Sequence, residues 1–150
     1  MNDYSRRRAL QATALISALS SIGLLGPSSA HAATDAFAAR SVADVFKALG
    51  AEPAGSADVD LKSPDIAENG AVVQVTINSA LPRTQEIHLL VEKNPYPLVA
   101  STTIPEGTDA FVQLRAKMGQ TTTVWALVKA DGRWFTASKE TKVTLGGCGG

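Results

Sequence analysis

The sequence predicts a mainly β protein, an immunoglobulin-like antiparallel β-sandwich with a short N-terminal helix and a flexible C-terminal Gly-Cys arm. From residue 59 onwards, short runs rich in β-branched residues alternate with turn signals, which is typical of small all-β sandwiches. The chain of 150 residues is 45% hydrophobic and 19% charged, as expected for one globular domain. The cysteine and tryptophan pattern of antibody domains is absent, so the likeness to immunoglobulins concerns the layout alone.

Residues 1–32 are predicted to be a twin-arginine-type signal peptide. The SRRRAL sequence at residues 5–10 resembles the twin-arginine motif, with Ala9 where that motif prefers Phe. An apolar stretch at residues 12–25 and the A-x-A site that ends at Ala32 complete the signal. A Sec signal with three arginines is the alternative, and either route predicts a periplasmic protein with no membrane segment after cleavage.

Residues 35–49 predict one amphipathic helix, with Thr34 or Asp35 as N-cap and Gly50 as C-cap. Its apolar side chains recur mostly every three to five residues: Phe37, Val42, Val45, Phe46 and Leu49. Because a small sandwich often leaves a face uncovered, part of this helix or the sheet near residues 72–75 could pack on a partner chain. The following residues, 51–58, contain Pro53 and Gly55 and predict a loop.

Seven strands are predicted at close spacing, and the last of them is expected to be bent or bulged. Their ranges are residues 59–62, 71–78, 84–91, 98–104, 110–118, 122–129 and 134–145. Turn signals separate them at Asn69-Gly70, Asn94-Pro95, Glu106-Gly107, Met118-Gly119 and Asp131-Gly132. Residues 33–145 therefore form the predicted sandwich domain.

Little in the sequence indicates a catalytic, cofactor or nucleic-acid site. Basic and acidic residues both number 14, so the chain lacks the positive field that nucleic acid selects. After cleavage His88 is the only histidine, and its place in an apolar strand predicts a structural or surface role. The acidic pairs Asp58 with Asp60 and Asp65 with Glu68 are interpreted as solvated loop charges. No motif for haem attachment, a P-loop or a dinucleotide is present, and no cofactor is expected.

Cys148 is the strongest functional candidate, because an exported protein normally pairs its cysteines and this chain has one. It lies in the terminal arm formed by Gly146, Gly147, Gly149 and Gly150, where glycine gives the backbone wide freedom. The extended step from residue 145 to the thiol spans roughly 10 Å. The arm sequence offers no cation to lower the thiol pKa from about 8.5, so partner proteins are expected to activate it.

Several other interpretations of Cys148 remain open at this stage. The cysteine could be incidental to a disordered tail, or it could crosslink subunits. An exported interaction or chaperone module would not need the thiol at all, and an enzyme would use it as a nucleophile.

The chain resembles the SoxY family, the sulfur-carrier subunits of the thiosulfate-oxidising Sox system. The resemblance rests on the terminal GGCGG, on PDIAENG at residues 64–70 with Asp65 where the family has Glu, on VEKNPYPLV at residues 91–99, and on KMG at residues 117–119. It implies that residues 146–150 are a swinging arm and that Cys148 is the covalent attachment point for sulfur. No chemistry is assigned to residues 64–70, which are interpreted as structural or as a docking surface for a partner.

The same resemblance implies a set of partners. A SoxZ-like β-protein would form a heterodimer with the chain, and a c-type cytochrome enzyme would conjugate thiosulfate to Cys148. A thiosulfohydrolase would then release sulfate, and a sulfane dehydrogenase would oxidise the remaining sulfur. The chain itself is expected to be a carrier and not an enzyme.

Overall fold

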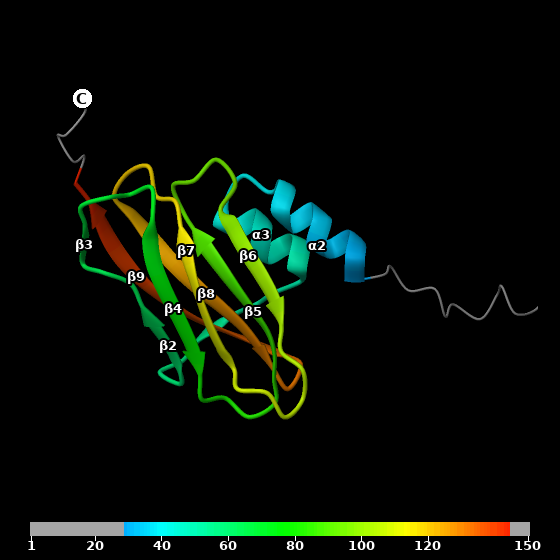
Figure 1. The fold of residues 1–150 in the computed structure, drawn as a ribbon. Helices are drawn as coiled ribbons and strands as arrows, with labels where there is room; N and C mark the ends of the chain where they lie inside the picture. Colours follow the sequence, from blue (N-terminus) through cyan, green and yellow to red (C-terminus); the bar gives the residue numbers. More distant parts are fainter. Residues whose placement is uncertain (1–28, 145–150) are drawn as a thin grey trace, which may run out of the picture. The chain divides into compact units, whose positions relative to one another are not determined.

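The computed structural model describes residues 29–144, with the side chains from residue 34 onwards (Figure 1). Most of the predicted signal peptide and the whole Gly-Cys arm therefore lie outside the described residues. The chain divides into the units Met1–His31 and Ala32–Gly150, and the second unit contains all the described strands. No helix within residues 29–144 has the length and apolar character needed to cross a membrane.

Two helices precede nine strands in the described chain. In order they are α2 Ser29–Ala38, α3 Val42–Leu49, β1 Ala54–Gly55, β2 Val59–Lys62, β3 Ile66–Ala67, β4 Val73–Ser79, β5 Thr84–Val91, β6 Leu98–Thr103, β7 Phe111–Ala116, β8 Thr122–Ala130 and β9 Arg133–Val143. The larger sheet has the order β1-β9-β8-β5-β6, with β3 also paired to β9, and the smaller sheet has the order β2-β4-β7. The long ladders are antiparallel, which confirms the predicted sandwich.

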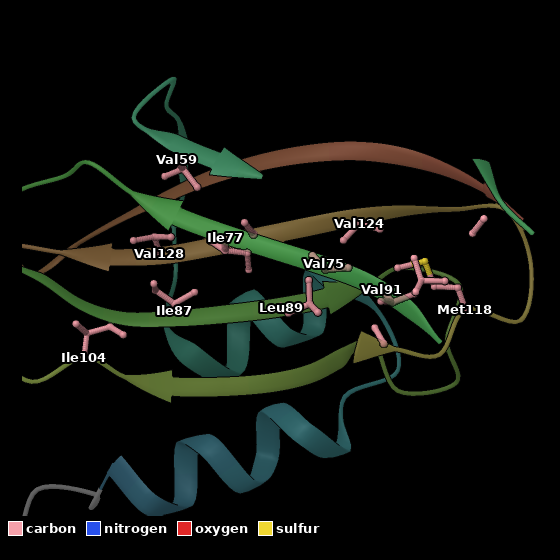
Figure 2. Close-up of a cluster of buried hydrophobic side chains, with 14 residues drawn as sticks. Val59, Val75, Ile77, Ile87, Leu89, Val91, Ile104, Met118, Val124 and Val128 are labelled. Atoms are coloured by element: carbon pink, nitrogen blue, oxygen red, sulfur yellow. The ribbon is translucent and has the colours of Figure 1, made fainter. Parts of the chain in front are cut away.

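The main hydrophobic core fills the space between the two sheets (Figure 2). Alternate residues of each strand face it, as the period of two along a strand requires. The labelled members show this alternation: Val75 and Ile77 from β4, Ile87, Leu89 and Val91 from β5, and Val124 and Val128 from β8. Such a core holds the sheets together because burying one of these side chains contributes roughly 1.5–3 kcal/mol.

A second apolar cluster lies between the helices and the opposite face of the larger sheet. Leu90 from β5 and Leu127 from β8 are fully buried in it, together with Ala36 from α2 and Val45 from α3. Strands β5 and β8 are therefore buried on both faces over much of their length, which explains why residues 87–91 are all buried and are apolar except for His88.

The prediction of one helix over residues 35–49 is wrong, because the chain forms two helices. Ser41 interrupts them: its backbone is extended and its hydroxyl accepts a hydrogen bond from the Asp44 amide at 3.1 Å, so it is the N-cap of α3. The predicted C-cap at Gly50 is confirmed, with a left-handed φ of 62°.

Most side chains that we expected to pack on a partner are used inside the domain. The helix residues contact the larger sheet, and the β4 residues lie in the main core. The expectation is wrong for Val45, Val73 and Val75, which are buried, whereas Val42 and Phe46 are partly buried against the second cluster. Of the candidates, Phe37 and Val72 remain exposed, at 42% and 52%.

The predicted strands agree with the structure to within two residues at each end, and two further strands appear. β1 and β3 have two residues each and pair in parallel with β9. The last strand was expected to be bent or bulged, and it has no bulge along β8, because the two strands pair in one register from Thr122 opposite Thr141 to Ala130 opposite Arg133. The register shifts fall instead where β5 pairs with β6 and with β8.

The turn between β8 and β9 accounts for this regular register. Asp131 and Gly132 have φ values of 50° and 73°, so both central residues of the two-residue loop are left-handed. This is the geometry of a type I′ turn, whose twist matches that of the two strands it joins.

Replacing Gly132 with alanine tests the importance of this turn. The Cβ would force a side chain into the left-handed region, so we expect the free energy of unfolding to fall by about 1–2 kcal/mol. The measurement is the urea unfolding midpoint, with Gly55→Ala as control, because Gly55 has no positive φ and open space around its Cβ. Equal shifts in the two variants would show that the turn conformation contributes nothing.

Candidate functional site

The structure describes the chain up to Thr144, four residues before Cys148. Cys148 and the glycines Gly146, Gly147, Gly149 and Gly150 lie outside the described residues, so the nearest described part of the site is the end of β9 with Thr144. We call residues 142–144 the arm root. They are the end of β9 and the first residue beyond it.

A short segment, residues 63–70, holds the arm root against the sandwich, and we call it the strap. Its strand β3 pairs in parallel with Lys142 and Val143. The Lys142 amide donates a hydrogen bond to the Asp65 carbonyl at 2.9 Å, and the Thr144 amide donates to the Ala67 carbonyl at 3.1 Å. The Thr144 hydroxyl also donates to the Ala67 carbonyl, at 3.4 Å. The chain is therefore hydrogen-bonded to the domain up to its last described residue.

Side chains further back along β9 hold the start of the strap. Lys139 Nζ donates to the Ser63 carbonyl at 2.7 Å and forms an ion pair with Asp65 Oδ1 at 2.9 Å. The hydroxyls of Ser63 and Thr141 are hydrogen-bonded to each other in a buried position. Because the Asp65 side chain is 87% exposed, its ion pair contributes little, and the contacts of Ser63 matter more.

Hydrogen bonds also join the loops at this end of the sandwich. They run from Met118 N to Gly70 O at 2.7 Å, from Asn94 Nδ2 to Lys117 O at 3.0 Å, from Lys93 N to Thr122 Oγ1 at 3.0 Å and from Val143 N to Thr121 Oγ1 at 3.1 Å. The loops are residues 63–72, 92–97 and 117–121, and Figure 1 shows them at the end where β9 stops. We call this the root end.

The three internal segments that carry the SoxY resemblance all contribute to the root end. In the sequence they are separate, and nothing there indicates that they meet. Residues 64–70, which had no assigned chemistry, contain most of the strap. The structure thus gives these residues a structural role beside the arm root.

Gly70 makes a close approach that no other residue could make. A Cβ at this position would overlap the Met118 carbonyl oxygen and would lie 2.7 Å from Val143 Cγ1. The glycine is needed here for its lack of a side chain, whereas the sequence indicated only a turn. Its contact links the strap to the loop that carries Met118 and to the arm root.

His88 lies on β5, away from the main core, and its side chain is 1% exposed. Its Nε2 is 3.2 Å from Glu86 Oε2, and the ring packs on Trp134 with centroids 5.5 Å apart. Burial lowers the pKa of His88 below its usual 6.5, and the nearby carboxylate of Glu86 offsets this only in part. A buried imidazole packed against Trp134 fits the structural alternative of the structural or surface role predicted for His88.

The remaining titratable groups do not assemble into a site within residues 29–144. Asp58, Asp60, Asp65 and Glu68 are all exposed, as expected for solvated loop charges. In the same part of the chain, no group of three or more His, Cys, Asp or Glu is arranged to hold a metal ion.

The residues that sequence reasoning missed are those that fix the arm root: Ser63, Ala67, Lys139, Thr141 and Thr144. Neither the types of these residues nor their spacing in the sequence indicates a catalytic or binding role. The Ser63–Thr141 and Ala67–Thr144 contacts are 78 and 77 residues apart in sequence, so only the folded chain brings them together.

Solved structures with the same layout define the class of protein. The sulfur carrier protein SoxY from Chlorobium limicola f thiosulfatophilum is 33% identical, with a TM-score of 0.61 over 67% of this chain and 93% of that chain. Superoxide reductase (neelaredoxin) from Ignicoccus hospitalis is 17% identical, with a TM-score of 0.52 over 57% of this chain and 80% of that chain. The second likeness concerns the fold alone.

Residues 43–148 match the family model of the sulfur oxidation protein SoxY. The chain therefore belongs to the SoxY family, as the sequence resemblance indicated, and has a carrier role in sulfur oxidation. The matched region reaches Cys148 and includes the strap and the root end. A search of curated proteins finds no significant match.

The Gly70→Ala substitution tests the strap. Because the new Cβ would overlap a main-chain carbonyl, we expect a loss of roughly 1–3 kcal/mol in the free energy of unfolding. We also expect faster hydrogen exchange at the Lys142 and Thr144 amides, read by NMR or mass spectrometry. The control is Gly119→Ala, which meets open space. Unchanged exchange at those two amides would contradict the role of Gly70 at the arm root.

The lowered pKa of His88 predicts a pH dependence of stability. As pH falls below about 6.5, the unfolded chain takes up a proton at His88 while the folded chain does not. The contribution of neutral His88 to the free energy of unfolding is therefore complete above about pH 6.5. It is lost as the pH falls towards the lower pKa that His88 has in the folded protein. We expect the difference in free energy of unfolding between the wild type and His88→Gln to shrink between pH 7.5 and 5. Parallel pH profiles for the two proteins would refute this.

Proposed function

We propose that this protein holds thiosulfate-derived intermediates covalently on the Sγ of Cys148 and presents them to partner enzymes in the periplasm. The observation that carries the proposal is the single cysteine placed four residues beyond a hydrogen-bonded arm root, in a chain of the SoxY family. Support for the location comes from the signal-like sequence of residues 1–32.

The proposed chemistry begins with a disulfide-type bond. The thiolate of Cys148 and the sulfane sulfur of thiosulfate join, and the two electrons released pass to a c-type cytochrome enzyme. Because a free thiol has a pKa of about 8.5, the enzyme must supply the positive charge or base that forms the thiolate.

The later steps free the sulfur in two parts. A thiosulfohydrolase adds water to the terminal sulfonate, so sulfate and two protons leave and a persulfide remains on Cys148. A sulfane dehydrogenase then oxidises the outer sulfur of that persulfide to a sulfonate: three water molecules supply the oxygen, six protons are released, and six electrons pass to the enzyme. A second hydrolysis by the thiosulfohydrolase frees this sulfonate as sulfate and returns the thiolate of Cys148. In each step the carrier contributes the attachment atom and its delivery, and the partner contributes the catalytic groups.

We further propose that a SoxZ-like β-protein forms a heterodimer with this chain. Val45, Val73 and Val75 are buried inside the domain, so they are not available to this partner. Edge strands β6 of the larger sheet and β7 of the smaller sheet offer backbone groups for such pairing.

Replacing Cys148 with serine tests the carrier function. The protein is taken from cells grown on thiosulfate, and its intact mass is recorded before and after reductant. We expect reductant-labile sulfur adducts on the wild type, none on Cys148→Ser, and loss of thiosulfate oxidation in the variant.

A matched control tests whether thiosulfate oxidation requires the thiol to be on the C-terminal arm, and not only to be present. The double variant Cys148→Ser with Ala80→Cys keeps one exposed thiol but moves it to the loop between β4 and β5. We expect it to support no thiosulfate oxidation. Full activity in Cys148→Ser would instead favour an interaction module in which the cysteine is dispensable.

A further inference from the structure

Arg40 connects the helices to one of the loops at the root end. It lies in the turn between α2 and α3, and its guanidinium carbon is 4.2 Å from the centroid of the Tyr96 ring. Tyr96 belongs to loop 92–97, which joins β5 to β6. A cation placed over an aromatic face is attracted to it even where both side chains are exposed, as they are here. The sequence gives no sign of this contact.

A second contact joins the same two parts of the fold. Trp125 Nε1 donates a hydrogen bond to Glu92 Oε2 at 3.3 Å, and the Trp125 ring packs edge-on against Phe46 of α3, with centroids 6.3 Å apart. The start of α3 and Lys93 line a surface groove with these side chains. Because this groove lies between α3 and the loop, the link between them depends on the side chains that bridge it.

Loop 92–97 is itself bonded to the start of β8 and to loop 117–121. The Lys93 amide donates to Thr122 Oγ1 at 3.0 Å. Asn94 Nδ2 donates to the Lys117 carbonyl at 3.0 Å. A movement of loop 92–97 would therefore disturb the loop that precedes β8.

Loop 117–121 continues the series of contacts to the arm root and the strap. Thr121 Oγ1 accepts a hydrogen bond from the Val143 amide at 3.1 Å. The Met118 amide donates to the Gly70 carbonyl at 2.7 Å. An unbroken series of contacts thus runs from Arg40 to Val143, through segments that are far apart in the sequence.

We infer that Arg40 and Tyr96 form a latch between the helices and the root end, and that this latch steadies the arm root through loops 92–97 and 117–121. Arg40 is a positioning residue, because it acts on Val143 through Tyr96 and the two loops. The latch goes beyond the carrier function, since it would hold the arm root whatever the thiol binds. A change at the turn between the helices is then felt where the arm begins.

The test is hydrogen exchange of single amides in the purified protein, followed by NMR, for the wild type and Arg40→Gln. Glutamine removes the charge that lies over the ring. An exposed contact of this kind changes an equilibrium constant about two- to fivefold, so we expect the amides of Lys93, Met118 and Val143 to exchange faster by about that factor. Amides in the β2–β4 ladder report on unfolding of the whole domain and should keep their rates.

Two control variants separate the latch from a general effect of losing an arginine. Arg133→Gln removes a contact of the same kind at the start of β9, where the guanidinium carbon is 5.3 Å from the centroid of the Phe135 ring. It should leave the exchange rates at Lys93 and Val143 unchanged. Arg40→Lys keeps a cation over the Tyr96 ring and should restore most of the protection that Arg40→Gln removes.

A double variant tests whether Arg40 acts through Tyr96. Tyr96→Leu should speed exchange at the same amides as Arg40→Gln does. Adding Arg40→Gln to Tyr96→Leu should then have no further effect, because the contact is already absent. Additive effects of the two changes would contradict the latch.

The remaining contrary results are distinct from one another. Unchanged exchange at Lys93 in Arg40→Gln would overturn the latch itself. Faster exchange at Lys93 alone, with Met118 and Val143 unchanged, would confine the contact to its own loop and overturn its role at the arm root. An equal rise in the β2–β4 amides would assign the effect to the stability of the whole domain and also overturn the inference. None of these results depends on the chemistry of Cys148.

Discussion

The parallel pairing of β3 with the end of β9 is the constraint on which the site depends. A thiol on a tether is delivered reliably only if the tether starts from a fixed point. Here backbone hydrogen bonds from Lys142 and Thr144 to the strap provide that point. Each such bond contributes on the order of 1 kcal/mol, so the arm root stays attached while the domain is folded. The reach of Cys148 is then set by the four residues beyond Thr144.

The rest of the sandwich serves as a rigid support for this end. The central strands β5 and β8 are covered by the smaller sheet on one face and by α2 and α3 on the other. In the described chain, apolar packing occupies the middle of the sandwich, and the last described residues lie at the end where β9 stops (Figure 1). The likeness to a superoxide reductase shows that the same layout can carry unrelated chemistry.

Much of the fold could be predicted because its strands are long enough to show a pattern. The strand at residues 84–91 and the turn at Asp131-Gly132 follow from local composition. The break at Ser41 was missed because the apolar spacing continues across it, and the cap depends on the Asp44 amide. β1 and β3 were missed because two residues show no period, and their partner strand lies about 75 to 80 residues further along the chain.

The candidate site divides in the same way. Cys148 could be chosen as a candidate from the sequence because a lone cysteine among glycines is a local signal. The strap could not, because Ser63, Lys139 and Thr141 have ordinary side chains whose importance comes from long-range contacts. Gly70 lies between these cases. The sequence predicted a turn there, but only the structure shows that a side chain at this position would overlap the backbone carbonyl of Met118.

The position of β1 and β3 has one more consequence. Both lie along the outer edge of β9, one opposite Phe135 and Thr136 and the other opposite Lys142 and Val143. An uncovered strand edge is a template for pairing with another copy of the same chain. By occupying part of that edge, four residues of the domain itself leave less of the β9 backbone for another copy to pair with, and so act against self-association of the sandwich.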